Sequence, residues 1–181
     1  MKKLLIFSSA AILFLLLNIA FVTTAPAQES GSIISGSVLA GIQESSLTGI
    51  KLGQYYSLRG SFLNLFGELR HDYWGNSSSY VSDNGIVAGA DFSLFHIMVA
   101  GGIGIGRSSY QAPAYQVSAV LTVTPPVLTY STFIYEAQAM YQFDIVAGLL
   151  TAGVGVNYVA ESNTIAPIYG WGGVAMLSLG F

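Results

Sequence analysis

The C-terminal stretch from Trp171 to Phe181 alternates between two kinds of side chain. Every second residue belongs to an apolar row with an aromatic residue at each end: Trp171, Gly173, Ala175, Leu177, Leu179 and Phe181. The residues between them are small and mixed. A repeat of two residues is that of a β-strand, because a helix repeats every 3.6 residues. A strand of about ten residues with such an apolar row is the unit of a transmembrane β-barrel.

The N-terminal 27 residues have the order of a secretory signal peptide. Lys2 and Lys3 precede an apolar run that reaches Val22, and Ala25-Pro26-Ala27 supplies an A-x-A ending. This order favours cleavage after Ala27 over an uncleaved membrane helix. The mature domain is then 28–181. Because the chain contains no cysteine, a lipid anchor on cysteine and a disulfide framework are both excluded.

The mature chain is poor in charge. Charged residues make up 8% of the sequence, far below the roughly 25% of soluble domains. A chain with so few charged side chains cannot cover its outside with them, so we expect that outside to face lipid. Residues 28–181 carry four bases and nine acids, a formal net charge of −5. Nucleic-acid partners are excluded, because they require a basic face.

The mature chain contains no uninterrupted apolar run of the length that a spanning helix needs. The nearest candidate, from Ile145 to Ala160, is rich in glycine and valine, contains Asn157, and alternates as a strand does. A closed β-barrel is the other structure that satisfies every backbone group inside lipid.

Eight segments are predicted as strands from their alternation: 32–43, 50–58, 62–74, 85–95, 97–106, 127–143, 148–159 and the segment ending at Phe181. The predicted short turns are 59–61, 95–96 and 144–147, and the predicted longer loops are 43–47, 75–84, 107–126 and 160–169. Within the longest loop, Gln116 to Thr124 alternates as well, as an extension of the strands beyond the membrane would. All short turns fall on one side and all longer loops on the other. This is the asymmetry of an all-β, eight-stranded, antiparallel, up-and-down transmembrane barrel with short periplasmic turns.

Segment 62–74 shows most clearly which face meets lipid. Leu63, Leu65 and Leu69 share one face, whereas Glu68 and Arg70 share the other. A water-soluble barrel would place its leucines inside. The opposite arrangement predicts a membrane barrel with a polar interior.

The whole mature chain resembles the small eight-stranded bacterial outer-membrane barrels, the OmpA membrane domain and the OmpX group. The resemblance is one of pattern, with a signal peptide and a terminal Phe181, rather than of one motif. It implies an integral protein of the bacterial outer membrane, in contact with outer-membrane lipid. It further implies that the barrel assembly machinery reads the C-terminal strand and Phe181.

The inward rows contain the candidate site. We expect a polar network in the barrel interior made of Lys51, Glu68, Arg70, Asp91, Glu136 and Gln138, with Asp72 and Arg59 nearer the ends. Buried charges are costly unless they are paired, and eight strands enclose a space that side chains can fill. The network is therefore interpreted as an internal plug. A narrow ion path lined by the same residues, or a ligand pocket, stays open as an alternative.

Other chemical motifs are weaker. His71 and Asp72, followed by Ser77 to Ser79, suggest a lipid A-modifying acyl hydrolase or transferase, but the alternation sends His71 and Asp72 to opposite faces. The run from Gly101 to Gly106 lacks the spacing of a nucleotide loop, and its even-numbered glycines are expected to leave room for large side chains inside the barrel. No metal-ligand spacing is present. We expect no cofactor, no metal and no catalytic residue.

Four functions fit these observations. The first is a non-enzymatic outer-membrane barrel with a structural role, or with a role in recognising an extracellular ligand through its outer loops. The alternatives are a narrow channel or transport barrel, the lipid A-modifying enzyme, and a soluble secreted barrel that binds an apolar ligand.

Overall fold

The computed structural model describes residues 33–46, 52–76, 79–118, 121–147, 149–162 and 167–181. The predicted signal peptide, 1–27, lies outside the described residues and stays a prediction. Lys51 also lies outside them.

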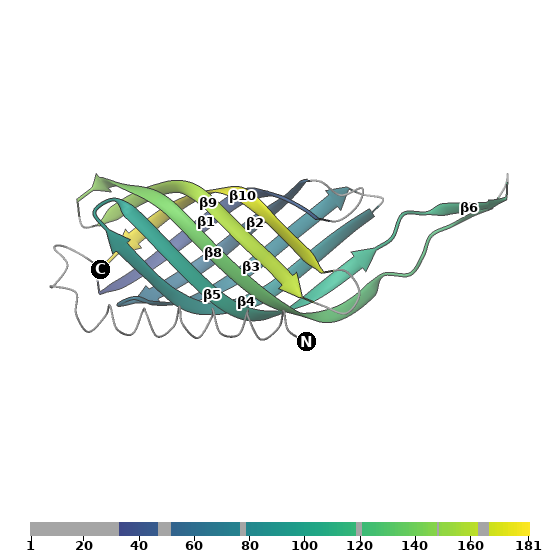
Figure 1. Cartoon of the computed structure of the whole chain (residues 1–181), viewed down its shortest axis with the longest axis horizontal. Helices are drawn as coiled ribbons and strands as arrows, with labels where there is room; N and C mark the ends of the chain where they lie inside the picture. Colours follow the sequence, from purple (N-terminus) through teal and green to yellow (C-terminus); the bar gives the residue numbers. More distant parts are fainter. Residues whose placement is uncertain (1–32, 47–51, 77–78, 119–120, 148, 163–166) are drawn as a thin grey trace, which may run out of the picture. The chain divides into compact units, whose positions relative to one another are not determined.

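Eight long strands form one closed antiparallel barrel (Figure 1), in the order β1-β10-β9-β8-β5-β4-β3-β2. Their bounds are β1 Ile34–Glu44, β2 Leu52–Phe62, β3 Leu65–Asn76, β4 Ser79–Leu94, β5 Ile97–Gln111, β8 Leu128–Val146, β9 Leu150–Ser162 and β10 Ile168–Gly180. The first strand closes on the last, and Ser35 is paired with Gly180. The predicted all-β, up-and-down, eight-stranded barrel is confirmed. Among the described residues, no helix is long and apolar enough to cross a membrane.

The barrel is apolar outside and charged inside. Leu63, Phe133 and Leu177 expose 61%, 60% and 50% of their surfaces, whereas Glu68 and Glu136 expose 2% and 5%. Burying carboxylates while leaving leucine outside is unfavourable in water and favourable in a bilayer. The outer wall is therefore that of a transmembrane barrel, as the alternation predicts.

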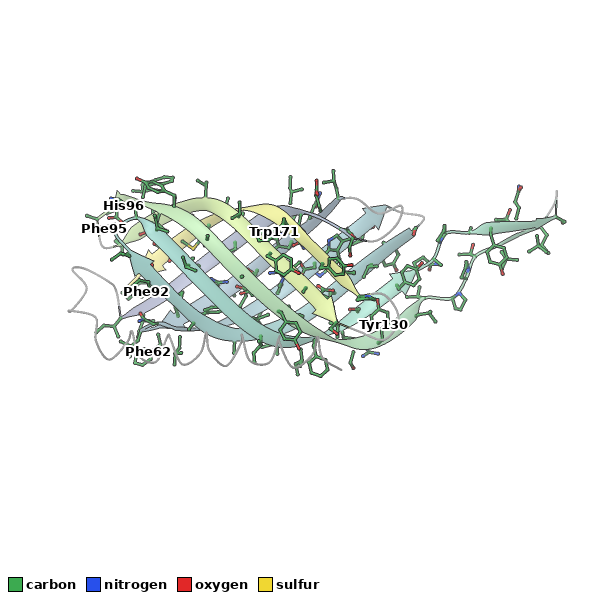
Figure 2. All side chains as sticks on the ribbon, in the orientation of Figure 1. Phe62, Phe92, Phe95, His96, Tyr130 and Trp171 are labelled. Atoms are coloured by element: carbon green, nitrogen blue, oxygen red, sulfur yellow. The ribbon has the colours of Figure 1, made fainter. Side chains whose placement is uncertain are left out.

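The two ends of the barrel differ. At one end, here called the turn end, neighbouring strands are joined by tight turns at Leu63–Asn64 and Phe95–His96. Phe62, Phe95 and His96 gather at this end (Figure 2). At the other end, here called the arm end, β5 and β8 continue into a separate hairpin, and Tyr130 lies where that hairpin begins (Figure 2).

The hairpin, here called the arm, consists of β6 (Tyr115–Ser118) and β7 (Leu121–Val123). These strands pair with each other and form a sheet apart from the barrel. Prolines at 113, 125 and 126 separate them from β5 and β8, because proline cannot donate to a strand ladder. The Gln111 amide closes the base of the arm by donating to the carbonyls of Ala112 and Pro125, at 3.1 and 2.8 Å.

Two predicted turns are misplaced. Residues 59–61 lie inside β2, and the chain turns instead at Leu63–Asn64. Arg-Gly-Ser reads as a turn by composition, yet Leu63 is the residue that adopts the left-handed backbone, with φ of 54°. The predicted turn at 144–147 is also displaced, because β8 continues to Val146 and the Leu149 N–H donates to the Val146 carbonyl at 3.0 Å. The turn predicted at Phe95–His96 is confirmed.

Three predicted loops are largely strand. In 75–84, β3 continues to Asn76 and β4 begins at Ser79, so that Trp74 pairs with Val81. In 160–169, β9 continues to Ser162 and β10 begins at Ile168. In 107–126, β5 continues to Gln111 and the alternating part forms the arm rather than extending the barrel ladder. Serine, asparagine and glycine suggest loops in soluble proteins, but here they occupy strands at the arm end. The predicted loop at 43–47 begins one residue before β1 ends, at Glu44.

Candidate functional site in the barrel lumen

Arg70 is the centre of a buried network inside the barrel. Its Nε donates to Asp72 Oδ2 at 2.6 Å and its Nη2 to Asp72 Oδ1 at 2.8 Å, so the two side chains form a two-point pair. Its Nη1 donates to Glu136 Oε2 at 2.8 Å. Alternation brings Arg70 and Asp72 to the same side of β3, and closure of the barrel brings β8 across the lumen to meet them. Such charge-assisted bonds are the strong ones.

Arg59 forms the second centre. Its Nε donates to Glu68 Oε2 at 2.8 Å, and its Nη2 donates to Glu136 Oε1 at 3.0 Å. The same Nη2 contacts the carbonyl oxygen of the Gln138 side chain at 3.0 Å. Glu136 therefore accepts from both arginines, one on each oxygen. It links β8 to the neighbouring strands β2 and β3 across the lumen.

Aromatic and amide side chains complete the network. The Arg59 guanidinium lies 4.0 Å from the centre of the Phe66 ring, and that of Arg70 lies 4.4 Å from the centre of the Tyr55 ring. Such contacts stabilise a desolvated cation. The Gln43 amide donates to Asp72 at 2.6 Å. These contacts hold the guanidinium planes in position across the lumen.

Apolar side chains border the network towards both ends. Two residues beyond Asp72 on β3, Trp74 is fully buried, and its partner Val81 on β4 is buried as well. Towards the turn end, Met140 follows Gln138 on β8 and is paired with Met98 on β5; both are buried. The inward residues predicted from alternation thus form a polar layer between two apolar ones.

The predicted site residues fall into three groups. Glu68, Arg70, Glu136 and Gln138 lie together in the network. Asp91 also faces the lumen but lies beside Ser61, nearer the turn end, and takes no part in the ion pairs between described residues. The placement of Lys51 lies outside the described residues.

The sequence does not predict three of the buried charged residues as members of the main cluster. It predicts Arg59 in a turn nearer the end of the barrel, and Asp83 and Glu161 in loops. The structure places all three in strands, with 2%, 0% and 1% of their surfaces exposed. The signal that could have found them is the same alternation: Val81 and Asp83 share a face with Gly85, as Val159 and Glu161 do with Asn157.

The even-numbered glycines of β5 make room for lumen side chains, as expected. A Cβ at Gly102 would lie 2.6 Å from Val87 Cγ1 and 3.1 Å from the tip of the Phe66 ring. Only a residue without a side chain fits at this position. The Phe66 ring therefore has the space it needs beside Arg59.

The candidate acyl hydrolase or transferase residues point apart. His71 Nδ1 is hydrogen-bonded to Asn84 at 2.9 Å on the outer side of the wall, whereas Asp72 binds Arg70 in the lumen. Ser77 and Ser78 lie outside the described residues. Among the described residues, no group of three or more His, Cys, Asp or Glu side chains is arranged to hold a metal ion.

The arrangement of strands is similar to that of two solved structures. One is the N-terminal β-barrel domain of Pseudomonas aeruginosa OprF, with a TM-score of 0.52 and 9% identity over 82% of this chain and 99% of that chain. The other is Neisserial surface protein A, with a TM-score of 0.51 and 14% identity over 82% of this chain and 96% of that chain. The fold is that of the small outer-membrane β-barrels. No family model and no curated protein matches the chain by sequence.

Proposed function

We propose that this chain is an integral protein of the bacterial outer membrane whose lumen is closed and whose arm displays an uncharged recognition surface outside the cell. The inverted surface, with leucine outside and arginine inside, supports residence in a membrane. The likeness in fold to outer-membrane barrels and the predicted signal peptide support the outer membrane.

The observation that carries the proposal is the arm. From Ser108 to Tyr135 the chain contains no charged residue. In β6 and β7, Tyr115, Val117 and Leu121 expose more than half of their surfaces. An isolated two-stranded hairpin is at best marginally stable, and each of its edges offers unpaired backbone groups. Such a hairpin suits a partner that adds an extended strand and covers the apolar side chains.

The closed lumen favours this role over transport. The ion pairs of Arg59 and Arg70 cross the lumen, and apolar residues lie on both sides of them. Opening a path would require breaking buried pairs, each at a cost of about 3–5 kcal/mol. A non-enzymatic role is likewise proposed, since His71 and Asp72 lie on opposite sides of the wall.

Cysteine labelling tests the location and the display of the arm. The chain has no cysteine, so a membrane-impermeant maleimide would report one introduced residue. Val117→Cys, in the arm, is expected to react on intact cells. Its matched control, Phe95→Cys at the turn end, is expected to react only after the outer membrane is permeabilised. Equal labelling of both on intact cells, or labelling of Phe95→Cys alone, contradicts the proposal.

Two further measurements test closure and recognition separately. Refolded protein in planar bilayers is expected to show no unitary conductance, and reproducible openings would make the chain a channel. A phage-displayed library of peptides is expected to yield binders that lose binding when 112–127 is replaced by a short Gly-Ser linker. If every binder is indifferent to that replacement, the arm is not the recognition element.

A further inference from the structure

Among the described residues, the lumen holds more buried acids than bases. Among the described residues, two arginines, Arg59 and Arg70, face six buried or half-buried acids: Glu68, Asp72, Asp83, Asp91, Glu136 and Glu161. The two arginines are engaged by Glu68, Asp72 and Glu136. An ionised carboxylate removed from water is very costly unless a positive charge compensates it.

Asp83 and Glu161 are the acids of the arm end that these arginines do not bind. Asp83 is 0% exposed and Glu161 is 1% exposed. Their strands, β4 and β9, are not neighbours in the barrel, yet their carboxyl groups lie against each other in the lumen. Neither oxygen of Glu161 receives a hydrogen bond from a described residue. Two ionised carboxylates that face each other repel each other, and no donor among the described residues lies between these two.

Neutral oxygens surround this pair. Asp83 Oδ2 accepts a hydrogen bond from the Ser108 hydroxyl, whereas Asp83 Oδ1 has no donor among the described residues. The Tyr130 hydroxyl lies beside Ser108, and the buried Thr132 hydroxyl has no partner among the described residues. A Cβ at Gly106 would collide with Asp83 Oδ1 and lie 3.0 Å from Thr132 Cγ2. The glycine therefore keeps free the space beside Asp83 Oδ1.

We propose that Asp83 and Glu161 bind a divalent cation of the calcium class, with hydroxyl groups of the surrounding strands as neutral ligands. Calcium takes six to eight oxygen ligands in irregular geometry, whereas magnesium requires a nearly ideal octahedron. Carboxylates and hydroxyls on four different strands offer the first kind of site. The alternative to a cation is a proton shared by the two carboxyl groups. Such a proton would join one oxygen of each group and leave the second Glu161 oxygen without a partner among the described residues.

The cation would have a structural effect as well. It would join β4 to β9 across the lumen, and so hold together the end of the barrel from which the arm extends. Two fully buried apolar residues lie next to the site. Val81 is two residues from Asp83 on β4, and Ile168 on β10 is paired with Glu161. With only two carboxylates, we expect a dissociation constant of about 0.1–1 mM.

Terbium luminescence tests the site directly, because Tyr130 lies close enough to sensitise a bound lanthanide. Protein refolded in EDTA is titrated with Tb³⁺. We expect a saturable signal that Ca²⁺ displaces and that the double variant Asp83→Asn, Glu161→Gln loses. Asp91→Asn, which removes a lumen acid near the turn end, is the matched control and is expected to keep the signal.

Thermal unfolding supplies a second readout. The midpoint of the wild-type protein is expected to be higher with Ca²⁺ than with EDTA, whereas the double variant is expected to unfold at the same temperature in both. The proposal is overturned if folded wild-type protein shows neither a Tb³⁺ signal nor a Ca²⁺ shift, or if Asp91→Asn abolishes both. A wild-type midpoint that rises as the pH is lowered, with no response to Ca²⁺, would assign the pair to a proton instead.

Discussion

Replacing Arg70 with methionine removes the cation that donates three buried hydrogen bonds to carboxylates. Asp72 loses both bonds of its two-point pair, at 2.6 and 2.8 Å, and among the described residues it keeps the bond from the Gln43 amide. Glu136 loses its 2.8 Å bond and keeps Arg59. Methionine preserves most of the side-chain length, so the charge is the main change. Removing one partner of a buried pair costs about 3–5 kcal/mol, and we expect a loss of this size in the free energy of unfolding.

The matched variant is Glu136→Gln, which removes an acid from the same network. Arg59 keeps Glu68, and Arg70 keeps Asp72. Because each arginine keeps one carboxylate partner, neither Arg59 nor Arg70 is left unpaired. The expected cost is that of weakened hydrogen bonds, below about 1.5 kcal/mol.

The assay is urea unfolding of protein refolded into phospholipid vesicles, followed by tryptophan fluorescence and extrapolated linearly to zero denaturant. The reasoning predicts that Arg70→Met is clearly less stable than Glu136→Gln. The opposite order, or a loss below about 1 kcal/mol for Arg70→Met, would show that these pairs do not carry the charge balance of the lumen.

Two further predictions concern the wall and the turns. Ile103 lies in the middle of β5 and faces outward, and Ile103→Arg should lower the free energy of unfolding by about 2–4 kcal/mol in the same assay. Leu65 lies next to the turn, and Leu65→Arg should lower it by only about 0–1 kcal/mol. Equal losses would contradict a position of Ile103 deeper in the membrane than Leu65. Leu63→Gly should raise the stability by about 1 kcal/mol, since Leu63 has φ of 54° and glycine adopts such a backbone without a steric penalty; a lower stability would show that the leucine contributes more at the turn end than its backbone costs.

Alternation was sufficient to predict the two faces of the wall. A shift of one residue in a strand sends every side chain to the other face, so the leucines and acids of 62–74 determine their own orientation. The same argument placed Trp171 and Leu177 outside. It needs no knowledge of which strands are neighbours.

The contacts across the lumen could not be predicted in the same way. Arg59 contacts Glu136, which is 77 residues away in the sequence. Whether two such side chains meet depends on strand tilt and stagger, and periodicity within one strand does not report either of them. The turn at Leu63–Asn64 contains no glycine, while Arg59-Gly60-Ser61 resembles a turn. Arg59 was therefore placed near a barrel end, and its central role emerges only from the closed barrel.

Composition misled the prediction at the arm end. Asp83 and Glu161 lie in segments rich in serine and asparagine, which usually indicate loops. In this barrel the ladder extends through these segments, so both acids are held inside the lumen. The sequence therefore does not predict the burial of Asp83 and Glu161, the two residues that support the proposed cation site.

The two tryptophans allow the most direct test of whether lipid covers the outer wall. Trp171 is 65% exposed on the outside, whereas Trp74 is 0% exposed in the lumen, and the chain has no other tryptophan. Each is measured alone, in Trp74→Phe and Trp171→Phe, after refolding into vesicles whose lipid chains are brominated close to the glycerol. Strong quenching of Trp171 and little quenching of Trp74 is the predicted result. Quenching of Trp74 with Trp171 unaffected would contradict an outer wall in contact with lipid.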